Sequence, residues 1–449
     1  MAQPNGLDVD TASDPRRMRG SRLSSDVLRR SCDPESLSFQ TTDDLNAIVE
    51  TVGQPRAEEA LRFGMGMAHR GYNFFALGPG GVGRHALVRS TMEEAARTRP
   101  VPPDLSYVNN FEDERRPRAL LLPAGQGRQL RDDMDRFIEE LRTALPAAFE
   151  SEEYQEQHRT LEERIQQDQQ KALEDLQKRA RQEGVEVVQT PMGLTLTPSE
   201  EGREESPGEM DDETRRSLEE AAERFQTELQ QILQKVPQRQ RMLRERVRQL
   251  NQDVARRAID ESFDELRQRY DAHQNVLDHL GQVREDVVEK VEALVSAQLQ
   301  QTAGPQEEGG GALMAPHQQA AVDALYRRYK VNLLVDRSES DGAPLIFENH
   351  PTYPKLIGEI EHIAEMGMLT TDFTLIKPGA VHRANGGYLV LDAHQVLLQP
   401  LAWEALKRTL MAGEIRIESP GESLGLVSTV TLEPEPIQLD VKVALIGDP

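Results

Sequence analysis

The apolar residues of this chain change their spacing twice along its length, and the changes divide it into segments. In residues 41–150 and 317–449, short apolar runs alternate with helical patterns, which is typical of an α/β domain. In residues 151–300, apolar side chains recur at intervals of four and three within a background rich in Gln, Glu and Arg. This spacing places one apolar stripe along a helix and is typical of a coiled coil. We therefore expect an α/β domain interrupted by a long helical coiled-coil insertion.

The insertion itself contains one break in the helical pattern. The 4-3 stripe runs from Leu218 to Val236, resumes from Leu243 to Val254, and repeats from Ile259 to Tyr270. Residues 185–197 instead contain two runs of β-forming residues separated by Pro191-Met192-Gly193, which predicts a small β-hairpin. Helices on both sides of such a hairpin predict an antiparallel helical arm.

The remaining segments complete the predicted organisation. Residues 1–40 are polar and predict a disordered N-terminal segment. Residues 301–316, with three consecutive glycines, predict a flexible linker. We expect 41–150 to supply the first strands of the α/β sheet and 317–449 to return to the same sheet. Because the chain stops directly after the apolar run at 439–446, we expect the natural protein to continue beyond Pro449.

Charge and composition exclude several classes of protein. The formal net charge is −24, which disfavours nucleic-acid binding because such binding relies on Lys and Arg to neutralise phosphates. No run approaches the roughly 20 apolar residues of a membrane span, and the N-terminus lacks the apolar core of a signal peptide. The single cysteine, Cys32, allows no disulfide within the chain. We expect a cytoplasmic protein without membrane or nucleic-acid partners.

A glycine-rich segment follows the apolar run at 72–77 and is the first candidate ligand-binding segment. It has the spacing of the phosphate-binding loop G-x-x-x-x-G-K-[ST] but differs at the last two positions. In such a loop, backbone N–H groups and the start of the following helix surround a phosphate. Arg keeps the positive charge of the usual Lys, whereas His cannot replace the hydroxyl that binds Mg²⁺. The alternative is a structural glycine turn. The candidate ATP-binding residues are Gly78, Pro79, Gly80, Gly81, Val82, Gly83, Arg84 and His85.

The second candidate is Asp392, which ends the apolar run at 386–392. In enzymes with a phosphate-binding loop, an aspartate at this place holds Mg²⁺, so we predict Asp392 as a metal-binding and catalytic residue. The alternative is an ordinary aspartate at a strand end. The four histidines between 350 and 394 do not have the spacing of a zinc site. Nothing in the sequence resembles an activated serine or cysteine centre, so we expect no peptidase centre in this chain.

Several motifs together resemble the AAA+ ATPase part of the Lon-like (LonB-related) ATP-dependent proteases, over about Thr41 to the C-terminus apart from the insertion. They are Val52-Gly53-Gln54-Pro55-Arg56-Ala57, Gly71-Tyr72-Asn73, the glycine loop, Tyr107-Val108-Asn109-Asn110-Phe111, Arg116-Pro117-Arg118-Ala119-Leu120, Leu122-Pro123-Ala124-Gly125, Glu348-Asn349-His350-Pro351-Thr352-Tyr353-Pro354, Leu356-Ile357-Gly358 and 378–388.

The resemblance implies an ATP-driven homo-oligomeric ring that unfolds substrate proteins and delivers them to a serine protease domain with a Ser-Lys dyad. In that family the protease domain follows the ATPase part, so this chain would stop before it. AAA+ enzymes usually carry a glutamate directly after the strand-end aspartate, where this chain has Ala393. The alternative is a nucleotide-binding or inactive scaffold whose coiled-coil arm recruits a partner protein, and a measurement of ATP turnover separates the two.

Overall fold

The computed structural model describes residues 32–44, 54–67, 69, 71–190, 193–198, 212–302, 322–365, 368–418 and 432–449. It divides the chain into two units, 1–53 and 54–449. In the described part of the first unit, Pro34–Ser36 and Thr42–Asp44 each form one turn of 3₁₀ helix. Most of the predicted N-terminal segment, and all but the first two residues of the predicted linker at 301–316, lie outside the described residues.

A four-stranded parallel sheet forms the centre of the α/β part of the second unit. Its strand order is β1-β15-β12-β7, and every neighbouring pair is parallel. Strand β1 precedes the helical insertion in sequence, whereas the other three strands follow it. The strands are β1 (Phe74–Leu77), β15 (Lys442–Gly447), β12 (Tyr388–Asp392) and β7 (Leu345–Glu348).

Side chains alternate between the two faces of this sheet, and helices cover both faces. Tyr388 and Val390 of β12 pack on one side with Val88 and Met92 of α2. Leu389 and Leu391 pack on the other side with residues of α9, α10 and α12. A strand buried on both faces reads as a continuous apolar run, as β12 does. The helices are α1 (Pro55–Gly66), α2 (Arg84–Thr98), α9 (Tyr353–Ile357), α10 (Ala380–Arg383), α11 (Ala393–Leu397) and α12 (Pro400–Ala412).

Residues 41–150 and 317–449 both contribute to the parallel sheet, but not every strand of these two segments joins it. Strands β2 (Asp104–Val108), β3 (Arg118–Leu122) and β6 (Val331–Val335) form a separate antiparallel sheet in the order β3-β2-β6. All five residues of β2 are buried, including Asp104. The Asp104 carboxylate accepts hydrogen bonds from the backbone N–H groups of Gly127 and Arg337, at 2.8 and 2.7 Å. These bonds join β2 to the start of α3 and to the segment that follows β6.

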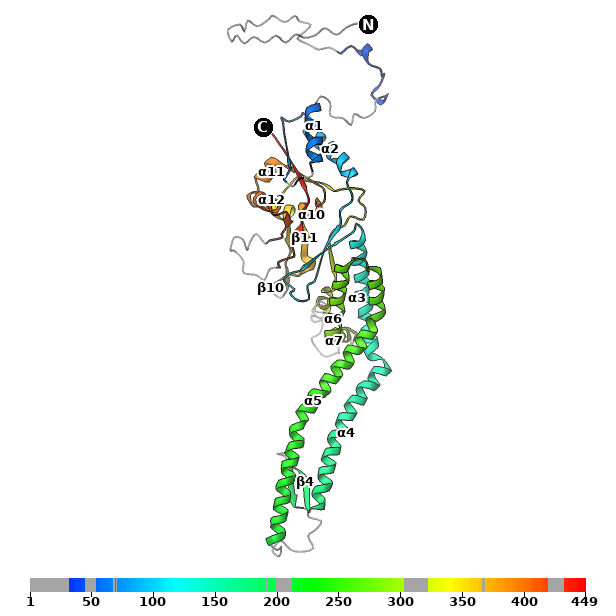
Figure 1. Cartoon of the computed structure of the whole chain (residues 1–449), viewed down its shortest axis with the longest axis vertical. Helices are drawn as coiled ribbons and strands as arrows, with labels where there is room; N and C mark the ends of the chain where they lie inside the picture. The colour runs from blue at the N-terminus through cyan, green and yellow to red at the C-terminus, as the bar shows by residue number, and fades with distance from the viewer. Residues whose placement is uncertain are drawn as a thin grey trace, which may run out of the picture. The chain divides into compact units, whose positions relative to one another are not determined.

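The helical insertion follows β3 and contains two long helices side by side, α4 and α5 (Figure 1). Near the β4–β5 hairpin the seam between them contains Phe225 and Leu229 of α5, which pack on Leu176 of α4. At the other end of α5, Phe263 packs into a larger core formed with α3, α6 and α7. The elements are α3 (Gln126–Glu150), α4 (Glu152–Gln182), β4 (Val185–Thr190), β5 (Gly193–Pro198), α5 (Asp212–Arg269), α6 (Gln274–Glu289) and α7 (Val291–Thr302). The predicted fold class, an α/β domain interrupted by a helical insertion, is confirmed.

The segments that connect the parallel strands contain additional short strands. They form three antiparallel pairs, and a 3₁₀ turn, Phe373–Leu375, precedes the last strand between β7 and β12. The strands are β8 (Gly358–Ile360), β9 (Ile363–Glu365), β10 (Met368–Thr370), β11 (Ile376–Pro378), β13 (Glu414–Ile415) and β14 (Ile437–Gln438). Among the described residues, no helix is both long and apolar enough to cross a membrane.

Candidate nucleotide-binding site

The carboxyl ends of the four parallel strands meet at one edge of the sheet, and we call this the C-terminal edge. Leu77 at the end of β1 is level with Gly447 of β15, and Ile446 is level with Asp392 of β12. Neighbouring strands lie about 4.8 Å apart, so Asp392 is about 10 Å across the sheet from β1. That separation is within the span of a nucleotide triphosphate with its metal ion. The sheet therefore brings the predicted loop and the predicted aspartate to the same edge.

The glycine loop leaves β1 at Gly78 and enters α2 at Arg84. Gly81 and Gly83 have φ angles of +85° and +77°, a conformation that glycine adopts without strain. A Cβ atom added to Gly80 or Gly81 would meet nothing within 4 Å, so the loop has open space around its backbone. The first turn of α2 carries no acidic residue, which leaves the positive end of the helix available to an anion. This backbone fits the phosphate groups of a nucleotide.

Arg84 is the first residue of α2, and its side chain is only 14% exposed. Its guanidinium donates a hydrogen bond to the carbonyl of Gly78 and forms an ion pair with Asp448, which follows β15. Its Nε is buried and has no hydrogen-bond partner. The Arg84 guanidinium therefore keeps one N–H group without a hydrogen-bond partner at the open side of the loop, where it can bind an anionic ligand. His85 is exposed and lies beside it at the start of the helix.

Asp392 ends β12 and also caps the next helix. Its Oδ1 accepts a hydrogen bond from the backbone N–H of Gln395 at 2.9 Å, so part of its role is structural. Within the described residues, no donor reaches its Oδ2. Mg²⁺ is commonly bound by one or two carboxylates together with the phosphates of its nucleotide, and one free carboxylate oxygen fits that pattern. No group of three or more His, Cys, Asp or Glu side chains that could hold a metal occurs among the described residues.

The turn that precedes β12 is fixed from both sides. Buried Arg337, which follows β6, donates a hydrogen bond to the carbonyl of Arg383 at 2.5 Å. His382 is fully buried, and its Nδ1 accepts a hydrogen bond from the N–H of Gly379 at 3.3 Å. Burial lowers the pKa of His382 to about 4, so the side chain is neutral at pH 7 and supports packing rather than charge. These contacts hold the strand that presents Asp392.

Two family models match parts of this chain. The model for the LonB-like AAA domain matches residues 341–449, which contain β7, β12 and β15. The model for the Lon-like LonC helical domain matches residues 104–137, which contain β2, β3 and the first half of α3. These two segments of the chain are similar to the Lon-like AAA+ family. No curated protein matches it.

The similarity supports a nucleotide-binding AAA+ domain and an ATP-dependent, Lon-type function in general terms. Neither matched segment contains the glycine loop, so the individual ligand-binding residues remain predictions. Asp448 was missed at the sequence level, although one signal was available. Like Asp392, it lies at the carboxyl end of an apolar run.

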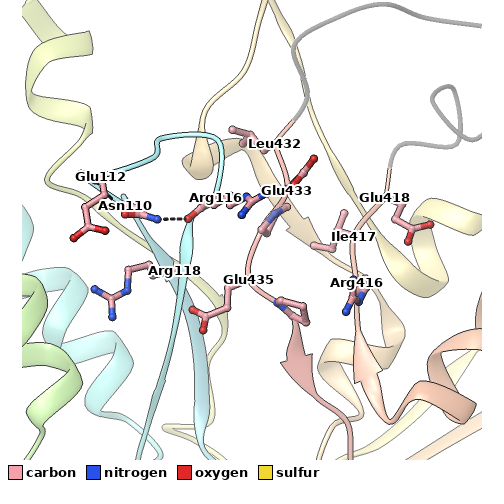
Figure 2. A pocket seen from close by; sticks show the side chains of 12 residues that line it. Asn110, Glu112, Arg116, Arg118, Arg416, Ile417, Glu418, Leu432, Glu433 and Glu435 are labelled. Atoms are coloured by element: carbon pink, nitrogen blue, oxygen red, sulfur yellow. Dashed lines mark hydrogen bonds and ion pairs between the residues drawn. The ribbon is translucent and has the colours of Figure 1, made fainter.

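A hollow of about 840 Å³ lies away from the glycine loop, between residues 110–118 and the segments 416–418 and 432–436 (Figure 2). Its wall carries both signs of charge, and Arg116 pairs with Glu433 at 3.3 Å. Glu435 joins the two walls, because its carboxylate accepts the N–H of Ala119 at 2.9 Å and its carbonyl accepts the hydroxyl of Tyr107 at 2.7 Å. None of its lining residues belongs to the glycine loop, so this hollow is separate from the candidate nucleotide site.

Proposed function

We propose that this chain is the ATPase module of a Lon-like ATP-dependent serine protease, and that it binds ATP at residues 78–85. The observation that carries the proposal is the C-terminal edge of the parallel sheet. There the glycine loop, Arg84 and Asp392 come together from segments that the helical insertion separates by about 300 residues in sequence.

The residues of this edge have distinct roles in the proposal. The backbone N–H groups of the loop and the start of α2 surround the phosphates, and Arg84 contributes a charge to them. Asp392 holds Mg²⁺ together with phosphate oxygens, and the metal neutralises phosphate charge when it is bound. His85 supplies no hydroxyl, so the protein contributes fewer metal ligands than the usual loop would.

Hydrolysis is coupled in this proposal to the unfolding and delivery of substrate proteins by a homo-oligomeric ring. The β9–β10 hairpin supports a contact with polypeptide, because Ile363 and Leu369 on it are 40% and 58% exposed. Exposed apolar side chains on a hairpin are suited to contact an unfolded chain, whose own apolar side chains are accessible. Peptide-bond cleavage is assigned to a Ser-Lys centre supplied outside this chain.

The test is ATP binding and turnover by the wild type and by Arg84→Ala. Charge-assisted hydrogen bonds contribute about 1.5–3 kcal/mol, so Arg84→Ala should weaken ATP binding about 10- to 150-fold in calorimetry. Arg97→Ala is the matched control, because it removes the same charge from an exposed position in the last turn of α2. Equal affinities of the wild type and Arg84→Ala would show that the loop is a structural turn.

A second candidate function is a nucleotide-binding scaffold whose coiled-coil arm recruits a partner. His85 and Ala393 favour it, because both replace residues that usually serve hydrolysis. ATP binding without turnover by the wild type would support the scaffold and contradict the ATPase.

A further inference from the structure

The middle of α5 is basic, although the chain as a whole is acidic. The formal net charge of the chain is −24, yet residues 229–252 contain six Lys or Arg and a single acidic residue, Glu245. Arg241, Arg244 and Arg248 follow one another at intervals of three and four, so they lie on one face of the helix, and all three are exposed. We call these three side chains the basic stripe. A charged helix face is often merely solvated, so the surroundings of the stripe decide whether it can bind a partner.

The arm leaves the basic stripe without charge compensation. Ion pairs between α4 and α5 occur on both sides of it, where Arg179 pairs with Glu228 at 2.7 Å and Arg257 pairs with Glu153 at 3.7 Å. Within the described residues, none of the three arginines of the stripe has an ion pair. Charges are therefore matched across the two helices on either side of the stripe, but not at the stripe itself.

The register of the two helices identifies which part of α4 lies opposite the stripe. The hydroxyl of Tyr154 on α4 donates a hydrogen bond to the side chain of Asn251 on α5 at 3.0 Å. Further along the arm, Leu176 of α4 shares a cluster with Leu229 of α5. These two contacts set an antiparallel register that places the stripe opposite α4 residues 157–164.

The carboxylates in that part of α4 pair within α4 itself. Glu162 lies 3.8 Å from the Nδ1 of His158, and Glu163 lies 3.6 Å from the Nε of Arg159. The stripe therefore keeps three like charges beside one another, and like charges three or four residues apart destabilise a helix. A negatively charged partner would replace this repulsion by attraction.

An apolar side chain lies on the same face of α5 as the stripe. Leu233 is 42% exposed and precedes Arg244 by about three helical turns, so the two side chains share a face. From Leu233 to Arg248 this face is about 22 Å long. The neighbouring seam is also incompletely covered, because Leu243 and Val247 are half-buried. A partner can therefore contact apolar as well as charged atoms at this place.

We propose that the basic stripe and Leu233 form a docking site for an acidic amphipathic helix of a partner protein. Carboxylates three and four residues apart on that helix pair with the stripe, since a guanidinium matches the geometry of a carboxylate. An apolar side chain of the same helix packs on Leu233. The site belongs to the arm and uses no nucleotide, so the inference goes beyond the proposed function and holds whether or not the chain hydrolyses ATP.

The observations favour a polypeptide over a nucleic acid as the occupant. The rest of the chain is strongly negative, so a phosphate backbone that extends past the stripe would be repelled. Phosphates would also leave Leu233 without a contact. A helix about as long as the stripe presents its carboxylates only where the arginines lie, and it can offer an apolar side chain as well.

The experiment measures the binding of a fluorescein-labelled peptide to the full 449-residue chain by fluorescence anisotropy at low salt. The peptide is built from Glu and Leu in the spacing described above and is about six helical turns long. Arg241→Gln/Arg244→Gln/Arg248→Gln, the stripe variant, should bind it at least about 10-fold more weakly, since each exposed ion pair changes an equilibrium constant by up to about 5-fold. Added salt should weaken binding by the wild type and change binding by the stripe variant little, because salt screens exposed charges.

The matched control is Arg159→Gln/Arg181→Gln/Arg256→Gln. It removes the same charge from the arm at three exposed arginines that each pair with a carboxylate, and it should keep the wild-type Kd. Leu233→Ser should weaken binding several-fold at low and high salt alike, because salt does not screen an apolar contact. Far-ultraviolet circular dichroism should show the helix content of the wild type for each variant.

Three results would overturn the inference. The first is that the wild type does not bind the peptide, or binds it no more tightly than the stripe variant does. The second is that single-stranded DNA binds more tightly than the peptide and is lost in the stripe variant, which would assign the stripe to nucleic acid. The third is self-association in sedimentation velocity that the stripe variant loses, without peptide binding, which would assign the stripe to a second copy of the chain. None of these measurements involves ATP, so the proposed function stands or fails separately.

Discussion

His279 offers a sharp test of how the helical part of the chain is packed. It lies on α6, is 1% exposed, and neither of its ring nitrogens has a hydrogen-bond partner. Its ring lies 5.9 Å from that of Phe111, measured between centroids. Burial, aided by the charge of Arg118, lowers the pKa of His279 to about 3. We predict that His279→Phe removes a large part of the acid sensitivity of folding.

The sign and size of the effect follow from the two states of the histidine. An unfolded histidine has a pKa of about 6.5, so it gains a proton as the pH falls below that value, whereas the buried side chain stays neutral until about pH 3. Folding stability due to His279 is therefore intact above about pH 7 and is lost as the pH falls from about 6.5 towards 3. At pH 5 the loss is about 2 kcal/mol. His382 contributes a similar loss that the variant retains.

The assay is urea unfolding followed by far-ultraviolet circular dichroism at pH 7, 6 and 5. The free energy of unfolding of His279→Phe should fall by about 2 kcal/mol less than that of the wild type between pH 7 and pH 5. His394→Phe, which removes an exposed histidine from α11, should keep the dependence of the wild type. Parallel pH dependences for the wild type and His279→Phe would refute the reasoning, because they would mean that His279 takes up its proton in the folded chain.

Two further substitutions test the core and the proposed polypeptide contact. Phe263→Ala should lower the free energy of unfolding by about 3–5 kcal/mol, because Phe263 is 1% exposed and its ring packs edge-on against Phe137 with centroids 4.8 Å apart. A loss under about 1 kcal/mol in urea unfolding would contradict this packing. Leu369→Asp should reduce the stimulation of ATP turnover by unfolded casein several-fold, whereas Leu397→Asp, equally exposed on α11, should not; equal stimulation of both variants would rule out the hairpin contact.

Local spacing was sufficient to predict the elements around the candidate nucleotide site, because each depends on neighbours in sequence. The apolar run before Gly78, the glycine loop and the following helix form as expected, with α2 beginning at Arg84. The apolar run that ends on Asp392 forms a buried central strand. These features depend on backbone conformation and on the alternation of side chains. Consecutive residues determine both, so both can be predicted from a short stretch of sequence.

Pairing between distant segments could not be predicted in the same way. Nothing near β2 indicates that β6, more than 200 residues later, is its partner, and so their pairing was not predicted. The ion pair between Arg84 and Asp448 joins residues about 360 positions apart. The 4-3 stripe located the seam of α5 correctly, yet Val236, Leu243 and Val247 are only half-buried. Spacing indicates which face of a helix is apolar, but not how closely a second helix covers it.

The position of the insertion affects the order in which parts of the protein fold during synthesis. Strand β1 ends at Leu77, and β15, the strand that it pairs with, begins only at Lys442, about 365 residues later. At the usual 5–20 residues per second, synthesis of the intervening chain takes about 20–70 seconds. The α4–α5 pair depends on contacts within its own segment and can form during that interval, whereas β1 has no strand to pair with. Phe75 and Leu77, exposed even in the folded structure, would then be accessible to chaperones throughout that interval.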